Sequence, residues 1–252
     1  MRSCRVLVVC AIVVVGGIRL VHAQTGTAAL AGAEVAAACA PSEGIAPAPG
    51  EGLRILGVQD TSPRTLYGLT DLVVLDGGSQ SGVQLNQEYF IRRPYAYGWR
   101  PRTGTRSQSI HTVGWLKVVA VNETTAVAQI QSICDGIVAG DFLEPFSAPV
   151  MFADGEPGTP ATLDFSSLGR VKFGDEERRM GAAGDFMLID GGMTPLTPGA
   201  RVAVYRDLDV ARLPLAAVGE GVIVAVTNGT PVMRITSSRD AIQSGDYVVR
   251  HK

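Results

Sequence analysis

The chain has 252 residues, of which 30 are Gly, 14 are Pro and 18% are charged. This length allows one large or two small domains, and the composition is typical of short strands joined by many turns. The formal net charge of −2 becomes more negative once an arginine-containing signal is removed, which argues against a dedicated nucleic-acid-binding protein.

Residues 1–23 have the three parts of a secretory signal peptide. Arg2 and Arg5 come first, residues 6–18 are apolar, and the small-residue segment 21–23 predicts the cleavage site. The apolar run is too short to span a bilayer, which takes about 20 residues. We therefore expect an exported, periplasmic protein whose mature chain has no membrane span.

Residues 24–51 are rich in Ala, Gly and Pro and predict a disordered tether. Two of the four cysteines leave with the signal, so Cys39 and Cys134 remain, and exported thiols commonly pair. We expect a disulfide that ties the tether to the first β-rich unit. In the alternative, Cys39 carries a lipid, but the aliphatic residue expected three positions earlier is missing.

Residues 52–146 predict the first β-rich unit. Its expected strands cover residues 54–58, 72–75, 87–93 and the two sides of a hairpin that turns at residues 122–124. A proline-containing linker follows over residues 147–166.

Residues 167–252 predict a second unit that restarts the same order of strands. The expected strands cover residues 170–173, 185–190 and 201–206, and a hairpin follows that reverses at Asn228-Gly229. This dipeptide tolerates the positive φ of a tight hairpin turn.

The two units share an ungapped repeat, in which residues 113–145 return about 105 residues later as residues 218–250. The shared positions are turn formers and alternating apolar residues, which shape a backbone, rather than acids, bases or nucleophiles. Those that return unchanged are Val113, Gly114, Val119, Ala120, Val121, Thr125, Val127, Ile130, Ser132, Asp135, Ile137, Gly140 and Asp141.

The repeat ends in the motif Ser-x-x-Asp-x-Ile-x-x-Gly-Asp, which predicts a short helical or 3₁₀ turn whose Ile enters the core. Gly140 and Gly245 would take the left-handed conformation that ends such a turn. Asp141 and Asp246 would accept hydrogen bonds from neighbouring backbone amides, which is a structural role.

Six short strands in each unit, without a long amphipathic helix, predict an all-β protein of two tandem small SH3-like β-barrels. Closure removes the exposed edges of a sheet. A single large sandwich is the competing fold.

The second unit carries a set of framework motifs. They are Gly184-Asp185, Pro198-Gly199-Ala200-Arg201, Val204-Tyr205-Arg206, Val218-Gly219 and Ile242-Gln243-Ser244-Gly245-Asp246. The pattern resembles the β-rich regions that follow LysM modules in Gram-negative envelope proteins, and the C-terminal domain of flagellar assembly protein T. The resemblance implies a non-enzymatic, periplasmic, wall- or machine-associated role. No LysM module is visible, so wall binding is not part of what the resemblance implies.

The inventory of reactive residues is thin. After removal of the signal only His111 and His251 remain, and neither has the spacing of a zinc site or of a catalytic triad. No phosphate-binding loop is present, and we expect no cofactor and no metal. Residues 175–179 (Asp-Glu-Glu-Arg-Arg) predict a solvated, charged hairpin turn.

One segment, residues 92–106, breaks the pattern, because the matching place in the second unit, residues 207–214, has one Arg and no aromatic ring. It combines arginines, which pair with carboxylates and phosphates, with aromatic rings, which stack on sugars. It would dock a glycan, an anionic lipid head group or an acidic partner; alternatively, its rings cover the barrel mouth. The candidate binding residues are Arg92, Arg93, Tyr95, Tyr97, Trp99, Arg100, Arg102 and Arg106.

The sequence therefore predicts a non-catalytic, exported cell-envelope adaptor or scaffold, whose partner is an envelope protein or a cell-wall polymer. The alternative is a peptidoglycan- or glycan-binding module that acts through residues 92–106. A hydrolase is the least favoured class because so few acid–base residues stand out.

Overall fold

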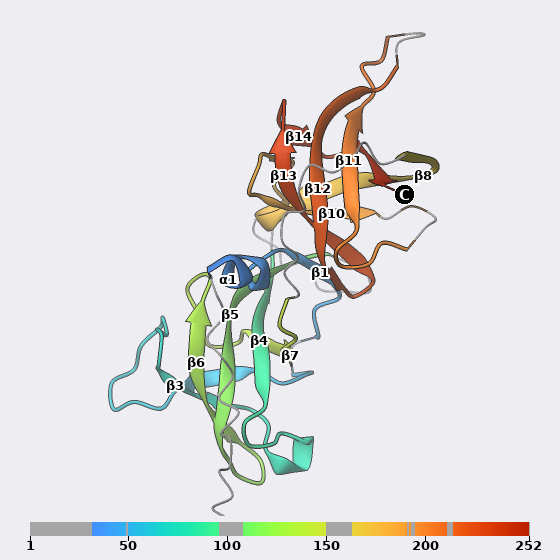
Figure 1. The fold of residues 1–252 in the computed structure, drawn as a ribbon. Helices are drawn as coiled ribbons and strands as arrows, with labels where there is room; N and C mark the ends of the chain where they lie inside the picture. The colour runs from blue at the N-terminus through green and yellow to red at the C-terminus, as the bar shows by residue number, and fades with distance from the viewer. Residues whose placement is uncertain are drawn as a thin grey trace, which may run out of the picture.

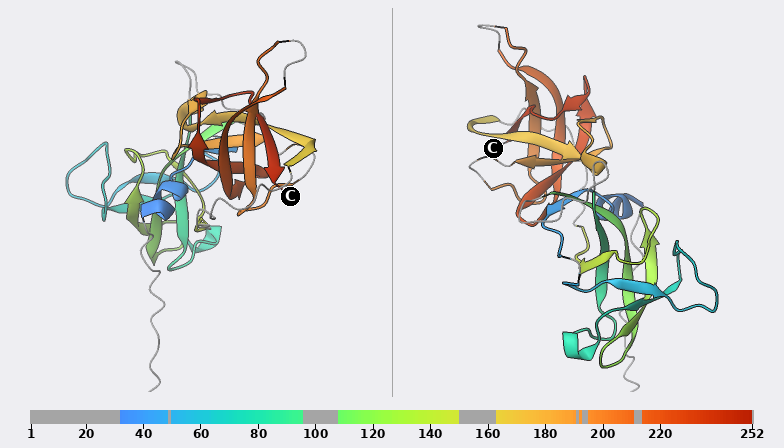
Figure 2. Two further views of the ribbon diagram at one scale, coloured as in Figure 1. Left: turned by 45° about the horizontal axis from the view of Figure 1, so that its top comes forward. Right: turned by 180° about the vertical axis from the view of Figure 1, so that it is seen from behind.

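The computed structural model describes residues 32–48, 50–95, 108–149, 163–190, 192, 195–210 and 214–251. These residues form two β-rich units that meet end to end, and the helix α1 (Gly32–Ala38) and the strand β1 (Ser42–Gly44) lie where the units meet (Figures 1 and 2). The second unit contains a closed six-stranded barrel.

In the first unit the described strands pair in the order β2-β3-β6-β5-β4-β7, with β1 beside β5. The two ends of this sheet are joined by one bridge between Arg54 and Phe142, and by a hydrogen bond of 2.8 Å from the amide of Leu143 to the carbonyl of Leu53. The elements are β2 (Ile55–Val58), β3 (Leu72–Leu75), η1 (Ser79–Ser81), β4 (Glu88–Pro94), β5 (Gln108–Val121), β6 (Ala126–Ile133) and β7 (Phe142–Pro145).

In the second unit six strands close in the order β10-β13-β12-β11-β15-β8, and β9 and β14 form a separate ladder. The elements are β8 (Leu163–Gly174), η2 (Asp175–Glu177), β9 (Met180–Gly181), β10 (Phe186–Asp190), β11 (Arg201–Arg206), β12 (Ala216–Thr227), β13 (Thr230–Ser238), β14 (Ile242–Gln243) and β15 (Tyr247–His251).

The hairpins β5–β6 and β12–β13 have the same register and two register shifts at equivalent places. Gly114 faces Ile133 in the first, and Gly219 faces Ser238 in the second. A Cβ atom on Gly114 would lie 2.3 Å from the carbonyl oxygen of Ser132, and one on Gly219 would lie 2.5 Å from that of Ser237. The close approach of two backbones explains why glycine occupies both positions.

Each unit has its own core, which rules out the single large sandwich. Ile137 and Ile242 are fully buried at the centres of these cores, as the repeated motif predicts. Asn228 and Gly229 both have positive φ, of 51° and 81°, which confirms the predicted hairpin turn.

The repeated motif ends in the predicted left-handed glycine, but the predicted helical turn before that glycine is wrong. Gly140 and Gly245 have φ of 92° and 97°, as expected. Instead of a helical turn, Ile137 forms a bridge with Tyr67, and Ile242 belongs to β14. The buried Ile is held by backbone pairing, which a helical turn would not allow.

The predicted tether over residues 24–51 is also wrong for residues 32–48. Here α1 forms and β1 pairs with β5, and Ala37, Ala38 and Ala40 are buried. Small side chains pack closely on a surface that larger side chains would not fit, so a composition that suggests a tether is compatible with a packed segment. The predicted linker is too long at its C-terminal end, because β8 begins at Leu163.

The close backbone approach at Gly114 predicts the effect of a substitution. Gly114→Ala should lower the free energy of unfolding by about 1–3 kcal/mol, because the added methyl group overlaps the carbonyl of the neighbouring strand. Urea unfolding followed by circular dichroism measures it. Gly32→Ala is the matched control, since a Cβ atom at Gly32 has no neighbour within 4 Å. Equal midpoints for both variants would contradict the packing argument.

Candidate functional site

An arginine–aspartate fork occurs once in each unit. In the first, Nε and Nη2 of Arg93 each donate to the carboxylate of Asp141 at 2.7 Å, and Nη2 also donates to the carbonyl of Gly136 at 2.8 Å. In the second, Arg206 donates to Asp246 at 2.8 Å through the same two nitrogens.

Each carboxylate also accepts a backbone amide: that of Val138 at 2.9 Å for Asp141, and that of Gln243 at 2.7 Å for Asp246. This confirms the bonding that the sequence predicts for the two aspartates. Since both carboxylates are nearly fully buried and fully bonded, they hold the strands rather than a ligand.

Arg92 is buried on the face of β4 opposite Arg93. It donates through Nη1 to the hydroxyl of Thr112, its Nε lies 3.3 Å from the carboxylate of Glu144, and its guanidinium lies 4.2 Å from the centre of the Phe90 ring. Burial lowers the pKa of Arg92, and the charge of Glu144 opposes that effect. Arg92 is therefore an internal cation, and Glu144 is its acidic partner among the described residues.

The candidate binding residues of segment 92–106 are placed only in part. Arg92 and Arg93 make the intramolecular contacts described above, and Tyr95 is half-buried with its amide bonded to the carbonyl of Ser109 at 2.9 Å. Ligand binding by the segment stays a prediction. The remaining candidates, which lie outside the described residues, are Tyr97, Trp99, Arg100, Arg102 and Arg106.

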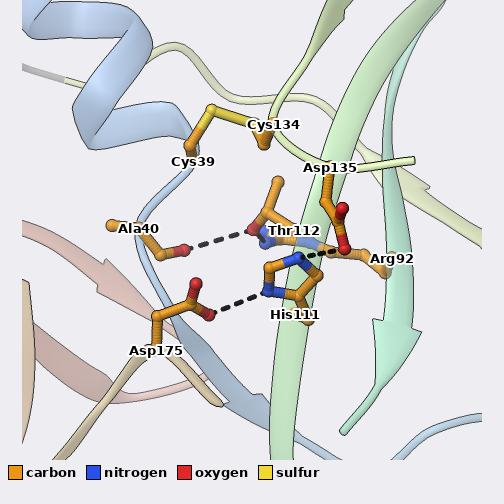
Figure 3. Close-up of a disulfide and its surroundings, with 8 residues drawn as sticks. All are labelled: Cys39, Ala40, Arg92, His111, Thr112, Cys134, Asp135 and Asp175. Atoms are coloured by element: carbon orange, nitrogen blue, oxygen red, sulfur yellow. Dashed lines mark hydrogen bonds and ion pairs between the residues drawn. A yellow bond between two sulfur atoms is a disulfide. The ribbon is translucent and has the colours of Figure 1, made fainter. Parts of the chain in front are cut away.

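The polar groups that the sequence did not indicate gather where the two units meet. His111 of β5 bonds through Nδ1 to the carboxylate of Asp175 at 2.8 Å, and its Nε2 lies 3.3 Å from that of Asp135 (Figure 3). Asp135 belongs to the first unit and Asp175 to η2 of the second. The predicted solvated turn at residues 175–179 is therefore wrong at Asp175, which bonds across the junction.

A second cluster at the junction centres on Glu43 of β1. Its carboxylate pairs with Lys172 of β8 and accepts from the hydroxyl of Thr230 at 3.2 Å. Its backbone carbonyl accepts from the side-chain amide of Asn228 at 3.1 Å. A segment expected to be a tether thus binds three side chains of the second unit.

Sequence reasoning missed these contacts because their partners are far apart along the chain. Glu43 and Lys172 are separated by 129 residues, and His111 and Asp175 by 64. No local spacing pattern links such residues.

Cys39 and Cys134 form a disulfide with a Cα–Cα distance of 5.6 Å (Figure 3). It joins the end of α1 to the residue after β6, and a bonded sulfur leaves no thiol at Cys39 for a lipid. A bridge across 95 residues stabilises the folded chain by about 4–5 kcal/mol in the chain-entropy description. Next to it, the carbonyl of Ala40 accepts from the hydroxyl of Thr112 at 3.1 Å.

A cavity of about 490 Å³ opens beside the disulfide, between the units. Its described wall is mostly apolar, with the Arg92–Glu144 pair as its charged part; other wall residues include Ala37, Pro41, Phe90, Val224 and Asn228. The described wall residues include no histidine or cysteine that could serve as a general base or a nucleophile.

Among the described residues, no three His, Cys, Asp or Glu side chains are grouped so that they could hold a metal ion. The described helix is not long and apolar enough to cross a membrane. No protein-family model matches the chain, and a search of curated proteins finds no significant match.

The ionic contact between the units predicts a pH dependence. The hydrogen bond to Asp175 raises the pKa of His111 above its ordinary value of 6.5, and the charges of Asp135 and Glu176 act in the same direction. Because the pKa of His111 is higher in the folded state, the stabilisation from this contact is fully present below the ordinary pKa of 6.5. It is lost as the pH rises through the folded-state pKa.

His111→Gln should therefore cost about 1–2 kcal/mol at pH 6 and less as the pH rises above 6.5, as measured by urea unfolding. His251→Gln is the control with the opposite sign, because burial lowers the pKa of His251 and its replacement should help most at acidic pH. A cost at His111 that stays constant with pH would refute the charged contact.

Proposed function

We propose that the chain is an exported, non-catalytic adaptor or scaffold of the cell envelope, built from two copies of one small SH3-like barrel. The observation that supports this most is the nature of the groups that recur in both units. Arg93–Asp141 and Arg206–Asp246, with the glycines at 114 and 219, fix strand geometry and offer no reacting atom.

The first unit is proposed as a less completely closed copy of the second. Its strand order matches that of the barrel, and the bridge between Arg54 and Phe142 stands where β8 and β15 pair Arg170 with Tyr247. Equivalent positions of the two hairpins have the same register. Tandem copies of one module suit a protein that presents surfaces rather than a protein that builds one catalytic centre.

Two features support export to an oxidising compartment. The Cys39–Cys134 bond is of a kind that persists in secreted and periplasmic proteins and is rare in the cytosol. The N-terminal segment has the composition of a signal peptide. A partner would be an envelope protein or a wall polymer that contacts the outer surfaces of the units.

Fractionation of cells that produce the full chain tests the proposal. We expect the protein in the periplasmic or wall-associated fraction, without alkylation of Cys39 or Cys134 before reduction. Recovery in the cytosol with two labelled thiols would contradict it. Pull-down with purified wall sacculi separates the glycan-binding alternative: salt-sensitive binding that is lost on replacing Trp99, Arg100 and Arg102 with Ala would favour that alternative over an adaptor role.

A further inference from the structure

The segment of residues 32–48, here called the bracket, contacts both units. On the side of the first unit, Cys39 is bonded to Cys134, and β1 pairs with residues 108–110 of β5. On the side of the second unit, Glu43 binds Lys172, Thr230 and Asn228. The bracket thus connects one unit to the other through a covalent bond at one end and a polar cluster at the other.

Apart from this bond, the bracket is held to the first unit by a short ladder, by small apolar clusters and by hydrogen bonds, and one of the clusters places Ala46 against Ile110 and Phe142. The β1–β5 ladder spans three residue pairs, and a ladder this short is marginal by itself. The helix α1 packs on Phe90 and Trp115 through Val35 and Ala38. Hydrogen bonds link Thr112 to Ala40, and Arg54 to the carbonyls of Pro47 and Ala48.

The polar cluster at Glu43 also depends on the position of β1. The carboxylate of Glu43 is mostly buried and meets Lys172 of β8 and Thr230 of β13, while its backbone carbonyl meets Asn228 in the turn between β12 and β13. A displacement of β1 by a few ångströms would break all three contacts, since hydrogen bonds weaken steeply beyond about 3.2 Å. The position of β1 therefore decides whether this cluster forms. His111 and Asp175 add a direct contact between the units, and Ala40 of the bracket packs in an apolar cluster with Val222 and Val224 of the second unit.

We propose that the Cys39–Cys134 disulfide is a redox-sensitive anchor that fixes the second unit against the first. While the bond is intact, Glu43 is held where its partners meet. When the bond is cleaved, the bracket detaches and the second unit moves independently. The proposal concerns the arrangement of the units and does not depend on an envelope role.

The cleavage requires a two-electron reductant. With a phosphine, the S–S bond breaks, water supplies two protons and the oxygen atom, and the products are the thiols of Cys39 and Cys134 and one phosphine oxide. In reverse, a disulfide-containing oxidant takes two electrons and two protons from the thiols of Cys39 and Cys134, leaves as two thiols, and the S–S bond of the anchor forms.

Cleavage also changes the cavity between the units. Ala37, Ala38, Ala40 and Pro41 of the bracket form part of its wall, and Val224 to Asn228 of the second unit form another part. Loss of the anchor separates these parts. A molecule that fits the closed cavity would bind only the oxidised chain.

The test compares the full chain, uniformly labelled with ¹⁵N, before and after reduction by a phosphine. ¹⁵N relaxation gives the rotational correlation time of each unit, and small-angle scattering gives the overall dimensions. Before reduction we expect one correlation time for both units. After reduction we expect a roughly twofold shorter value for the second unit, because it then tumbles as a body of about half the mass.

Glu43→Gln tests the same coupling with the disulfide intact. It removes the charge that pairs with Lys172, so we expect separate tumbling of the units while the shifts of the first-unit core stay unchanged. Glu51→Gln is the matched control, because Glu51 is exposed and lies just beyond the bracket. The control should behave as the unchanged chain.

Two results would overturn the proposal. One is a reduced chain in which both units still share one correlation time. The other is a reduced chain in which the first unit unfolds, since the bond would then serve the stability of that unit and not the coupling. If Glu43→Gln and Glu51→Gln give identical correlation times, the proposed role of Glu43 in holding the second unit is refuted, whatever the effect of reduction.

Discussion

A buried carboxylate held by an arginine fork is the constraint on which each unit depends. Asp141 and Asp246 lie between the end of the repeated motif and the last strand, where an uncompensated charge would be very costly. Arg93 and Arg206 supply the compensating charge from β4 and β11, so the strand pair that closes the unit is tied to the turn that precedes it. An aspartate in this position therefore requires a partner that carries a positive charge and presents two donors in a fixed geometry. The guanidinium of arginine meets this requirement better than the ammonium of lysine, which is a point charge.

Several local features could be predicted from the sequence because each depends on neighbours in the chain. The Asn228-Gly229 turn, the left-handed Gly140 and Gly245, and the burial of Ile137 follow from turn chemistry and alternation. The disulfide could be expected because only two cysteines follow the predicted signal.

The junction could not be predicted, because its contacts depend on how two units with separate cores meet. His111 and Asp175 come from different units, and nothing near either residue marks the other as its partner. The bracket could not be predicted for a different reason. Its Ala-rich composition is also that of a flexible segment, and only the surface that it packs against, around Phe90 and Trp115, shows why small side chains are needed.

The residues that recur and those that do not have different roles. The fork and the backbone-contact glycines recur and build each unit, whereas the junction uses positions at which the units differ. His111 corresponds to Ala216, and Lys172 corresponds by register to Leu56, which is exposed. The first unit therefore lacks the lysine that receives Glu43, and the second lacks the histidine that receives Asp175.

This asymmetry means that the same pairs of residues cannot repeat the contact between the units. The contact between them is heterologous, since different surfaces of similar modules meet, and contacts of this kind generate open chains when every module carries both surfaces. Here the first unit carries the surface with His111, and the second unit carries the surface with Lys172 and Asp175. A further copy would meet Ala216 where a histidine is needed and Leu56 where a lysine is needed. The positions at which the units differ thus make this contact specific to the first unit on one side and to the second unit on the other.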